Sequence, residues 1–307
     1  MKKRQHGAKA RSGRKPAPKV WLVTGSASGL GRSIAEAVLA SGDRLLATAR
    51  DPKRLEDLVK RYGDRIRTAP LDVSDESASI AAVAAAVKAF GRLDVVVNNA
   101  GYGDMAPFEQ VSSERFKALI DTDFYGVVNM TRAALPVMRE QRSGWILQIS
   151  SVGGRLALPG STGYHAAKWA VGGFTEALAQ EVAPFGVKVC ALEPGGMRTD
   201  WGARAIRDTP ELLPDYKASV GALAKQLESH WGKENSDPAK VAQVILKLAA
   251  GDRLPAHLLL GSDAIRYAGE AQASRDAEAK RWRDVSVSTD FEASGALPSL
   301  RFGGRDA

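Results

Sequence analysis

A short apolar segment that runs directly into a glycine-rich turn constrains the fold of this chain more than any other feature. Val20–Val23 is entirely apolar, and T-G-S-A-S-G-L-G follows it from Thr24 to Gly31. A helical pattern of apolar residues begins immediately afterwards. Strand, glycine turn and helix, in this order, form the arrangement in which a helix N-terminus holds the pyrophosphate of a dinucleotide. The chain is therefore predicted to open with a dinucleotide-binding βαβ unit.

Each glycine of this turn has a physical purpose in such a unit. Gly25 permits the tight turn, Gly29 lets the pyrophosphate approach the backbone, and Gly31 allows close packing between helix and strand. An ordinary glycine-rich turn is the alternative, but the spacing and the flanking strand and helix argue against it.

The end of the second predicted strand indicates which dinucleotide is bound. The strand Arg44–Thr48 is followed by Ala49, Arg50 and Asp51. Enzymes that use NAD usually present a carboxylate to the adenosine ribose here, whereas a guanidinium suits the 2′-phosphate of NADP. NADP(H) is therefore favoured. Asp51 could still reach a ribose hydroxyl, so NAD(H) remains possible.

Strands and helices alternate along the rest of the chain. Five further strands are expected at Ile66–Leu71, Asp94–Val97, Trp145–Ile149, Lys188–Glu193 and His257–Leu260. Helical patterns cover residues 76–90, 113–141, 161–184, 238–250 and 263–285. This alternation predicts an α/β fold: a single doubly wound, Rossmann-type parallel sheet of about seven strands with helices on both faces.

Charge and composition divide the chain into regions. Residues 1–19 hold eight Lys/Arg and no acid, so the remaining chain is neutral (+8 − 8 = 0). This segment is expected to be a disordered basic arm. Residues 20–262 are expected to form the Rossmann-fold domain, with 200–236 as a substrate lid segment, and residues 263–307 a C-terminal helical extension and tail.

Several classes of protein are excluded by composition. The single cysteine, Cys190, and four scattered histidines offer no metal-ligand spacing, so no metal site is expected. No apolar run reaches 18 residues, which argues against a transmembrane helix. One cysteine in a predicted strand fits a reducing compartment, and we expect a cytoplasmic protein.

A second group of residues predicts a proton-transfer site. Tyr164 and Lys168 are four residues apart in an Ala-rich helical pattern, so both project from one helix face. Ser151 follows a predicted buried strand, thirteen residues before the tyrosine, and this spacing favours it over Ser150. A nearby ammonium lowers the pKa of a phenol, and a serine hydroxyl can donate a hydrogen bond to a carbonyl or alkoxide.

These motifs together resemble the short-chain dehydrogenase/reductase family. The glycine turn, N-N-A-G at Asn98–Gly101, Ser151 and Y-H-A-A-K from Tyr164 occur in the family's order and spacing, and the resemblance covers about Val20 to Gly261. The T-A-R ending of the second strand and S-V-G-G after Ser150 resemble the branch of hydroxysteroid and retinol dehydrogenases and carbonyl reductases.

The resemblance implies roles at the matching positions. Tyr164 would be the general acid/base, Lys168 would lower its pKa and bind the nicotinamide ribose, and Ser151 would hold the substrate carbonyl. The nicotinamide carries the hydride chemistry. The residues implied in cofactor binding are Gly25, Ser28, Gly29, Leu30, Gly31, Arg50, Asp72, Val73, Asn99, Ala100, Gly101, Tyr164, Lys168, Pro194, Gly195 and Thr199.

The substrate is expected to lie under the segment after Thr199, because ligands of this fold bind beyond the carboxyl ends of the strands. The apolar character of that segment predicts a hydrophobic ketone or alcohol. Arg155 is expected to be an exposed loop residue, with a grip on an acidic substrate group as the alternative, and His165 to be a packing residue. The residues implied in substrate binding are Ser151, Val152, Tyr164 and Trp201.

One position departs from the family pattern. The family usually places an asparagine three residues before a glycine in the long helix after N-N-A-G, as a fourth catalytic residue, but D-T-D-F-Y-G puts Asp123 there. Its backbone carbonyl could still hold the water that links Lys168 to solvent in the family. A carboxylate near Lys168 could also change how the ammonium tunes Tyr164. Asn129, six residues later, is expected to face elsewhere.

The sequence therefore predicts an NADP(H)-dependent oxidoreductase with a small-molecule substrate. It would act on the CH–OH group of an alcohol or, in the reverse direction, on the corresponding carbonyl. A non-catalytic dinucleotide-binding sensor or scaffold is the alternative, and a third hypothesis makes the basic arm the functional part. No nucleic-acid or membrane partner is expected. By resemblance, residues 113–141 and 161–184 would pair copies into a homodimer or homotetramer.

Overall fold

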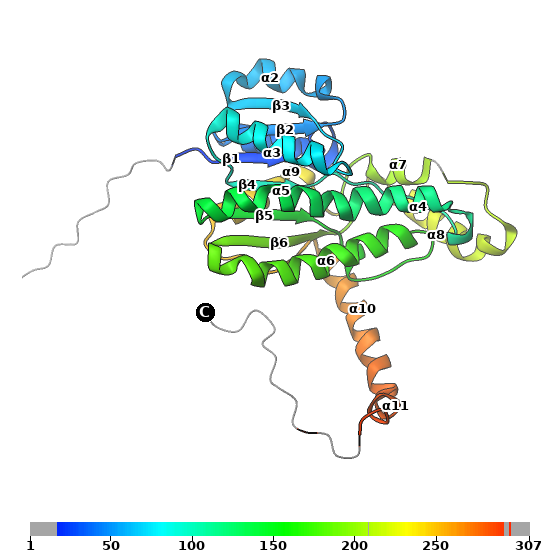
Figure 1. Cartoon of the computed structure of the whole chain (residues 1–307). Helices are drawn as coiled ribbons and strands as arrows, with labels where there is room; N and C mark the ends of the chain where they lie inside the picture. Colours follow the sequence, from blue (N-terminus) through cyan, green and yellow to red (C-terminus); the bar gives the residue numbers. More distant parts are fainter. Residues whose placement is uncertain (1–16, 208, 292–294, 296–307) are drawn as a thin grey trace, which may run out of the picture.

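Seven strands lie side by side in one all-parallel sheet, in the order β3-β2-β1-β4-β5-β6-β7 (Figure 1). The structure, a computed structural model, describes residues 17–207, 209–291 and 295. The strands are β1 Val20–Val23, β2 Arg44–Ala49, β3 Ile66–Pro70, β4 Val95–Asn98, β5 Gly144–Ile149, β6 Val187–Pro194 and β7 His257–Leu260. The strand order reverses between β1 and β4, which is where ligands bind in open sheets of this kind. The predicted α/β fold is confirmed.

Helices cover both faces of the sheet. Side chains of α1, α2 and α9 pack on one face, and those of α3, α5 and α6 on the other. The described helices are α1 Gly29–Ala40, α2 Glu56–Tyr62, α3 Glu76–Phe90, α4 Ser113–Ile120, α5 Gly126–Gln141, α6 Thr162–Val182, α7 Trp201–Arg207, α8 Ala222–Glu228, α9 Pro238–Ala250, α10 Ser262–Arg281 and α11 Arg283–Val287.

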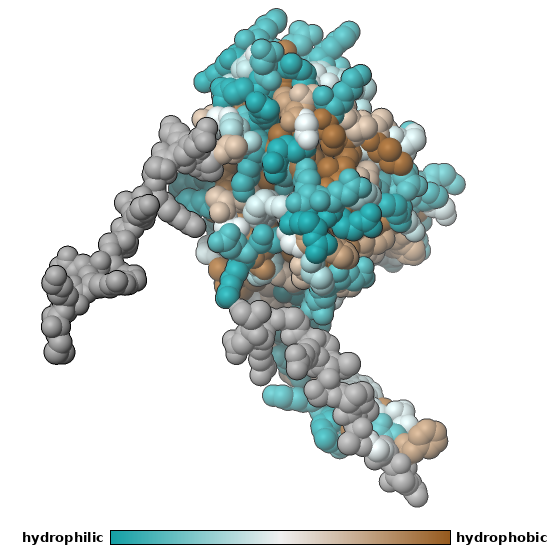
Figure 2. Space-filling model, turned by 60° about the vertical axis from the view of Figure 1, so that its left-hand side comes forward, coloured by the Kyte–Doolittle hydropathy of each residue, from teal (hydrophilic) through white to brown (hydrophobic). Residues whose placement is uncertain are grey.

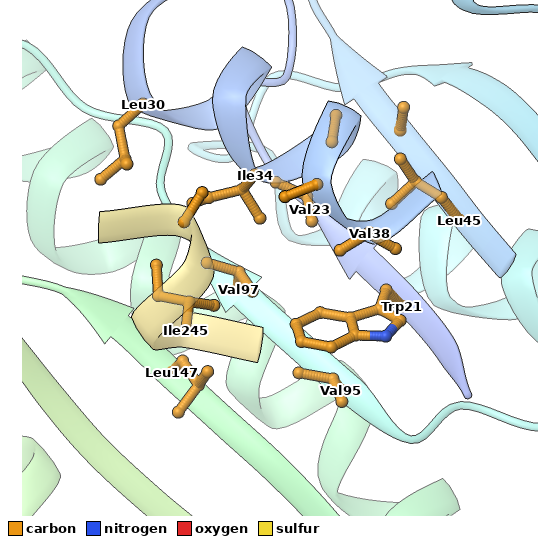
Figure 3. Close-up of a cluster of buried hydrophobic side chains, with 14 of the residues drawn as sticks. Trp21, Val23, Leu30, Ile34, Val38, Leu45, Val95, Val97, Leu147 and Ile245 are labelled. Atoms are coloured by element: carbon orange, nitrogen blue, oxygen red, sulfur yellow. The ribbon is translucent and has the colours of Figure 1, made fainter. Parts of the chain in front are cut away.

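The cluster beneath α1 and α9 shows why these segments fold together (Figure 3). Ile34 and Val38 of α1 and Ile245 of α9 point onto the sheet, where Trp21 and Leu147 meet them, and all five are 1% exposed or less. Because both faces of a parallel sheet are covered by helices, its strands are apolar almost throughout. The central strands β1 and β4 are accordingly buried at every residue.

Local signals set the helix ends that frame the sheet. The Asp75 carboxylate accepts a hydrogen bond from the backbone N–H of Ala78 (3.0 Å) and begins α3, which ends at Gly91 in a left-handed conformation (φ 79°). Asp237 caps α9 in the same way, with Pro238 as its first residue. Both helices lie where their patterns predict them.

The predicted long helix over residues 113–141 is interrupted. The α-helices α4 and α5 are joined by a π-helical turn over Asp121–Tyr125. Single π turns of this kind occur often at functional sites. The apolar pattern predicted one continuous helix because a single π turn interrupts it for only five residues.

The expected lid segment, residues 200–236, is mainly helical where it is described. It contains α7, a 3-10 turn at Pro214–Tyr216, a π turn at Lys217–Gly221 and α8. Beyond β7, α10 leaves the body of the molecule (Figure 1). The part of this extension that is visible in Figure 2 is mostly hydrophilic. Trp282 and Val285, at the start of α11 and within it, are exposed.

The expected basic arm lies almost entirely outside the described residues. Its last member, Lys19, belongs to the domain: its backbone N–H donates to Asp43 Oδ1 (2.9 Å) and its ammonium stands 3.7 Å from the ring centroid of Trp145. Burial lowers the pKa of Lys19, against the nearby carboxylates of Asp94 and Asp43.

The core of Figure 3 yields a stability prediction. Ile245→Ala should lower the free energy of unfolding by about 2–5 kcal/mol, because it removes a fully buried side chain and leaves a cavity between α9 and the sheet. Gln243→Ala, on the exposed face of α9, is the matched control and should change it by less than about 0.5 kcal/mol. Urea unfolding followed by circular dichroism measures both, and equal values for the two variants would contradict the assignment.

Candidate active site

The glycine turn after β1 forms a cradle at the carboxyl edge of the sheet. Gly25 and Gly29 have φ of 67° and 54°, which favour glycine over any other residue. A Cβ at Gly31 would overlap the Gly25 carbonyl, so α1 can pack against the turn only with glycine there. Ser28 is the N-cap of α1, and its side chain makes no capping hydrogen bond. The free N–H groups of α1 and the open backbone fit a dinucleotide pyrophosphate.

The turn is tied to the N-N-A-G motif by two polar side chains. Thr24 Oγ1 accepts hydrogen bonds from the backbone N–H groups of Asn99 and Ala100, both at 2.9 Å. In return, Asn99 Nδ2 donates to the Thr24 carbonyl at 2.9 Å. This reciprocal set, the Thr24–Asn99 clamp, fixes the ends of β1 and β4 on either side of the switch point. The predicted ribose-side residues Asn99, Ala100 and Gly101 therefore lie beside the glycine cradle.

The loop after β3 carries the predicted adenine-side residues. Asp72 Oδ1 accepts from the backbone N–H of Ser74 (3.0 Å), and Val73 packs against Gly126 of α5. Asn129 Nδ2 donates to the Val73 carbonyl at 3.0 Å. As expected, Asn129 faces away from Lys168, but it holds this loop, a contact that sequence reasoning did not identify.

At the end of β2, the two candidate ribose-binding residues have different surroundings. Asp51 Oδ1 accepts from the backbone N–H of Lys53 (3.1 Å) and caps the turn Pro52–Leu55. Arg50 is exposed, and its charge acts on Tyr102 across the site. The carboxylate is thus engaged locally, and the guanidinium borders the crevice.

Tyr164, Lys168 and Ser151 lie together at the end of β5, as predicted. The Ser151 hydroxyl lies beside the Tyr164 phenol and lowers its pKa, and its oxygen accepts a hydrogen bond from the Gly153 N–H (3.0 Å). The Lys168 ammonium lies 5.5 Å from the centroid of the tyrosine ring and donates to the Ile149 carbonyl at 3.1 Å. Ser150 instead donates to the Lys168 carbonyl (3.3 Å), a structural bond within the core.

Asp123 lies in the π turn and meets Lys168 directly. Its Oδ2 is 3.1 Å from Lys168 Nζ, and the two side chains are 0% and 6% exposed. Oδ1 accepts from the backbone N–H of Tyr102 at 2.9 Å. A Cβ at Gly101 would lie 2.9 Å from Oδ2, so the strand-end loop passes close over the carboxylate. Asp123 therefore links α6, the π turn and the loop after β4.

Burial and the ion pair set the protonation states. Burial alone lowers the pKa of Lys168, but Asp123 and Tyr164 raise it, and the net shift is upward. Burial raises the pKa of the Asp123 carboxyl against the pull of Lys168 and the Tyr102 amide. Because Oδ2 faces the Lys168 ammonium at 3.1 Å and Oδ1 accepts an N–H, we assign the pair as ammonium and carboxylate.

The phenol of Tyr164 departs from the simple expectation that Lys168 lowers its pKa. Burial raises the pKa above its ordinary value; Lys168 and the Ser151 hydroxyl oppose the rise, and Asp123 adds to it. Burial is the largest of these influences and the charge of Asp123 the smallest. In these surroundings the neutral phenol is the stable form at neutral pH.

His165 packs, as predicted, and also holds the serine loop. Its Nδ1 lies 2.9 Å from the Gly153 carbonyl, and Nε2 accepts from the Leu158 N–H at 3.0 Å. This pattern requires the neutral tautomer protonated on Nδ1. Burial accordingly lowers the pKa of His165.

The lid segment begins against both the cradle and the tyrosine. Pro194 ends β6, and the Gly195 N–H donates to Leu260 (3.0 Å). A Cβ at Gly29 would lie 3.8 Å from that of Thr199. The Trp201 ring lies 5.1 Å from the Tyr164 ring, at 55° between planes, and covers Gly103. Trp201 therefore borders the phenol, while Val152 lies in the turn beside Ser151.

Arg155 is not simply the exposed loop residue that was expected. Its Nε lies 3.2 Å from Glu193 Oε2, and that carboxylate is 1% exposed. His257 Nδ1 approaches the other oxygen at 2.8 Å. The guanidinium thus neutralises a buried protein carboxylate.

Within residues 17–207, 209–291 and 295, no group of three or more His, Cys, Asp and Glu side chains could hold a metal ion. No helix in those ranges is long and apolar enough to cross a membrane.

Comparison with known proteins agrees with this geometry. A sequence profile of the short chain dehydrogenase family matches residues 19–209, and the chain belongs to this family. Members are oxidoreductases that use a nicotinamide dinucleotide, so the protein is an oxidoreductase with a nucleotide cofactor and a small-molecule substrate.

Particular relatives span nearly the whole domain. Oxidoreductase BOA17 of Botryotinia fuckeliana is 45% identical over 272 residues, 88% of this chain and 99% of that protein. A short-chain dehydrogenase structure from Streptomyces avermitilis superposes with a TM-score of 0.83 at 40% identity, covering 90% of this chain and 100% of that one. A 3-ketoacyl-(acyl-carrier-protein) reductase from Brucella melitensis, complexed with NADH, gives 0.68 at 28% identity, covering 79% and 96%.

Proposed function

We propose that this protein interconverts a hydrophobic carbonyl compound and its alcohol with NADP(H), and that Tyr164 is the general acid/base. One observation carries the proposal: a phenol, a serine hydroxyl and a buried ammonium converge beside the glycine cradle. A chain that only sensed dinucleotides would not need these three groups on the substrate side.

Ser151, Tyr164 and Lys168 each have a different role in carbonyl reduction. Ser151 donates a hydrogen bond to the substrate oxygen, which fixes the carbonyl next to Tyr164. The phenol gives its proton to that oxygen as negative charge develops on it, and the Lys168 ammonium stabilises the phenolate that remains. The nicotinamide, when bound, supplies the hydride to the carbonyl carbon. In alcohol oxidation the proton returns to the phenolate.

The dinucleotide would be held by three parts of the site: the glycine cradle, the Thr24–Asn99 clamp and Lys168. The N–H groups at the start of α1 would bind the pyrophosphate, and Lys168 would donate to the ribose hydroxyls on the nicotinamide side. Trp201 covers the phenol and limits access of water to the reacting atoms. An enclosed site of this kind strengthens each electrostatic contact.

The raised pKa of Tyr164 favours the neutral phenol, which is the form that donates the proton in carbonyl reduction. A phenol that stays neutral at neutral pH is ready to donate a proton, whereas alcohol oxidation needs the phenolate. The carboxylate of Asp123 contributes to this bias because it disfavours a second negative charge nearby.

The surroundings of β2 support NADP(H) as the cofactor. Asp51 is engaged in a cap, and Arg50 presents an exposed guanidinium at the edge of the crevice. A guanidinium forms bidentate hydrogen bonds with a phosphate. The position of Arg50 therefore suits the 2′-phosphate, which NAD lacks.

The lid segment supports a hydrophobic substrate. Apolar side chains of the segment gather near the phenol: Trp201 contacts Tyr164, and Val220 meets Met105 beside Gly160. Most small-molecule sites are lined in this way, with few polar groups that fix orientation. The 3-keto substrate in the Brucella relative's name is consistent with a ketone.

We also propose that copies pair through α5 and α6 into a homodimer or homotetramer. A groove of about 540 Å³ lies along these helices, lined by apolar side chains that include Leu135, Phe174, Leu178 and Phe185. Burying apolar surface of this kind lowers the free energy of association.

Phe174→Asp should lower the mass found by sedimentation equilibrium, and an unchanged mass would contradict this interface.

The function is tested by following nicotinamide absorbance against a panel of aldehydes, ketones and alcohols. Tyr164→Phe should lower kcat/KM by about 100- to 10,000-fold, because it removes only the proton donor. Tyr125→Phe alters a tyrosine that is half exposed on the π turn and serves as the matched control. Turnover that survives in Tyr164→Phe would refute the acid/base assignment.

Cofactor choice is tested at Arg50. Arg50→Gln should raise the KM for NADPH about 10- to 100-fold and leave the KM for NADH unchanged, because one charged hydrogen-bond donor to phosphate is lost. Arg54→Gln, an exposed arginine in the next turn, should alter neither value. A wild-type preference for NADH would overturn the assignment.

The pH dependence is tested with Asp123→Asn, which keeps the shape and the acceptor for Tyr102. The carboxylate raises the pKa of Tyr164, so removing its charge lowers that pKa. In carbonyl reduction kcat/KM falls as the phenol deprotonates. The variant should therefore lose activity at a lower alkaline pH than the wild type. Identical pH profiles would exclude a role for the carboxylate.

A further inference from the structure

Helix α7 carries two different side chains toward the site from one face. Trp201 and Arg204 are three residues apart, a spacing that places them on the same side of a helix. Trp201 lies against the ring of Tyr164. Arg204 reaches the opposite wall of the crevice, where its Nη1 donates to Ser28 Oγ at 3.3 Å. One short helix therefore touches both the reacting end and the phosphate cradle.

The partner of Arg204 is at the anion-binding part of the cradle. Ser28 is the N-cap of α1, and its hydroxyl makes no bond to the helix. The adjacent Gly29 faces Thr199, two residues before α7, so the lid segment is already seated over this turn. A guanidinium that reaches Ser28 Oγ stands next to the free N–H groups at the start of α1.

The charge on Arg204 also distinguishes it from Arg32, which lies on α1. Arg32 is paired with Glu36 (2.7 Å) and with Asp57, so its charge is neutralised within the protein. None of the ion pairs between described residues includes Arg204, and the acceptor that the structure gives it is a neutral hydroxyl. A phosphate is a far stronger acceptor for a guanidinium than a hydroxyl is.

We propose that Arg204 is a cofactor-binding residue supplied by the lid segment, and that its guanidinium binds a phosphate group of the dinucleotide. This inference rests on the proposed dinucleotide site. It makes α7 a bridge: the dinucleotide holds the helix through Arg204, and the helix then holds Trp201 over Tyr164.

The cofactor has two phosphate groups that Arg204 could bind: the diphosphate and, in NADP, the 2′-phosphate. Both NADPH and NADH carry the diphosphate, whereas NADPH alone carries the 2′-phosphate. Measuring the Kd for each therefore separates the two. Loss of affinity for both cofactors assigns Arg204 to the diphosphate, and loss for NADPH alone assigns it to the 2′-phosphate.

The experiment compares Arg204→Gln, Arg204→Lys and Arg207→Gln with the wild type, using the increase in nicotinamide fluorescence on binding. Arg204→Gln should weaken NADPH at least tenfold and Arg204→Lys should recover part of the loss, because a charge is restored. Arg207, on the same helix, is the matched control and should leave both Kd values unchanged. The Kd of the wild type should rise more steeply with salt than that of Arg204→Gln.

The outcomes separate this inference from the proposed function. Kd values within twofold of the wild type for both cofactors in Arg204→Gln would overturn the assignment of Arg204, even in an active enzyme. Tight binding that depends on Arg204, in a protein that turns over no carbonyl or alcohol, would support the assignment and contradict the proposed reaction. A wild-type protein that binds neither cofactor would overturn both.

Discussion

The buried ion pair between Lys168 and Asp123 is the interaction on which the rest of the site depends. Leaving one of two buried charges without its partner costs about 3–5 kcal/mol, so the elements that carry them are held in one arrangement. Lys168 also donates to the end of β5, and Asp123 also accepts from the loop after β4. A helix, a π turn and two strand ends thus converge on two side chains. Lys168 lowers the pKa of Tyr164, and the Asp123 carboxylate opposes part of this effect. A neutral amide at the same position would not oppose it.

The crevice is defined by polar bonds between segments that are far apart in sequence. The Thr24–Asn99 clamp joins the ends of β1 and β4, and Asn129 holds the loop after β3 from α5. Each bond satisfies a backbone group that would otherwise be buried without a partner. These bonds keep the walls of the crevice rigid, while the lid segment contributes contacts from above. Rigid walls under a lid suit a reaction that needs a fixed hydride distance and a closed, dry site.

The sequence allowed much of this structure to be predicted, because strong local signals coincide with it. Apolar runs located all seven strands to within about a residue or two, and the glycine turn was correctly placed between β1 and α1. Less local features were beyond reach. The π turn at Asp123 interrupts a longer helical pattern for only five residues, and the contact of Arg204 with Ser28 spans 176 positions. The pKa of Tyr164 depends on burial and on a facing carboxylate, which only the folded chain brings together.

The entry of the chain into the sheet has a practical consequence. Lys19 is fastened beside Trp145 at the amino ends of the strands, and the crevice lies at their carboxyl ends, on the opposite side of the molecule in Figure 1. A fluorescent protein or a resin linker joined ahead of Val20 is therefore attached on the side of the domain opposite to the site. Immobilised through that end, the molecules would present their crevices outward to the solution, and substrate would reach them as freely as it does in solution.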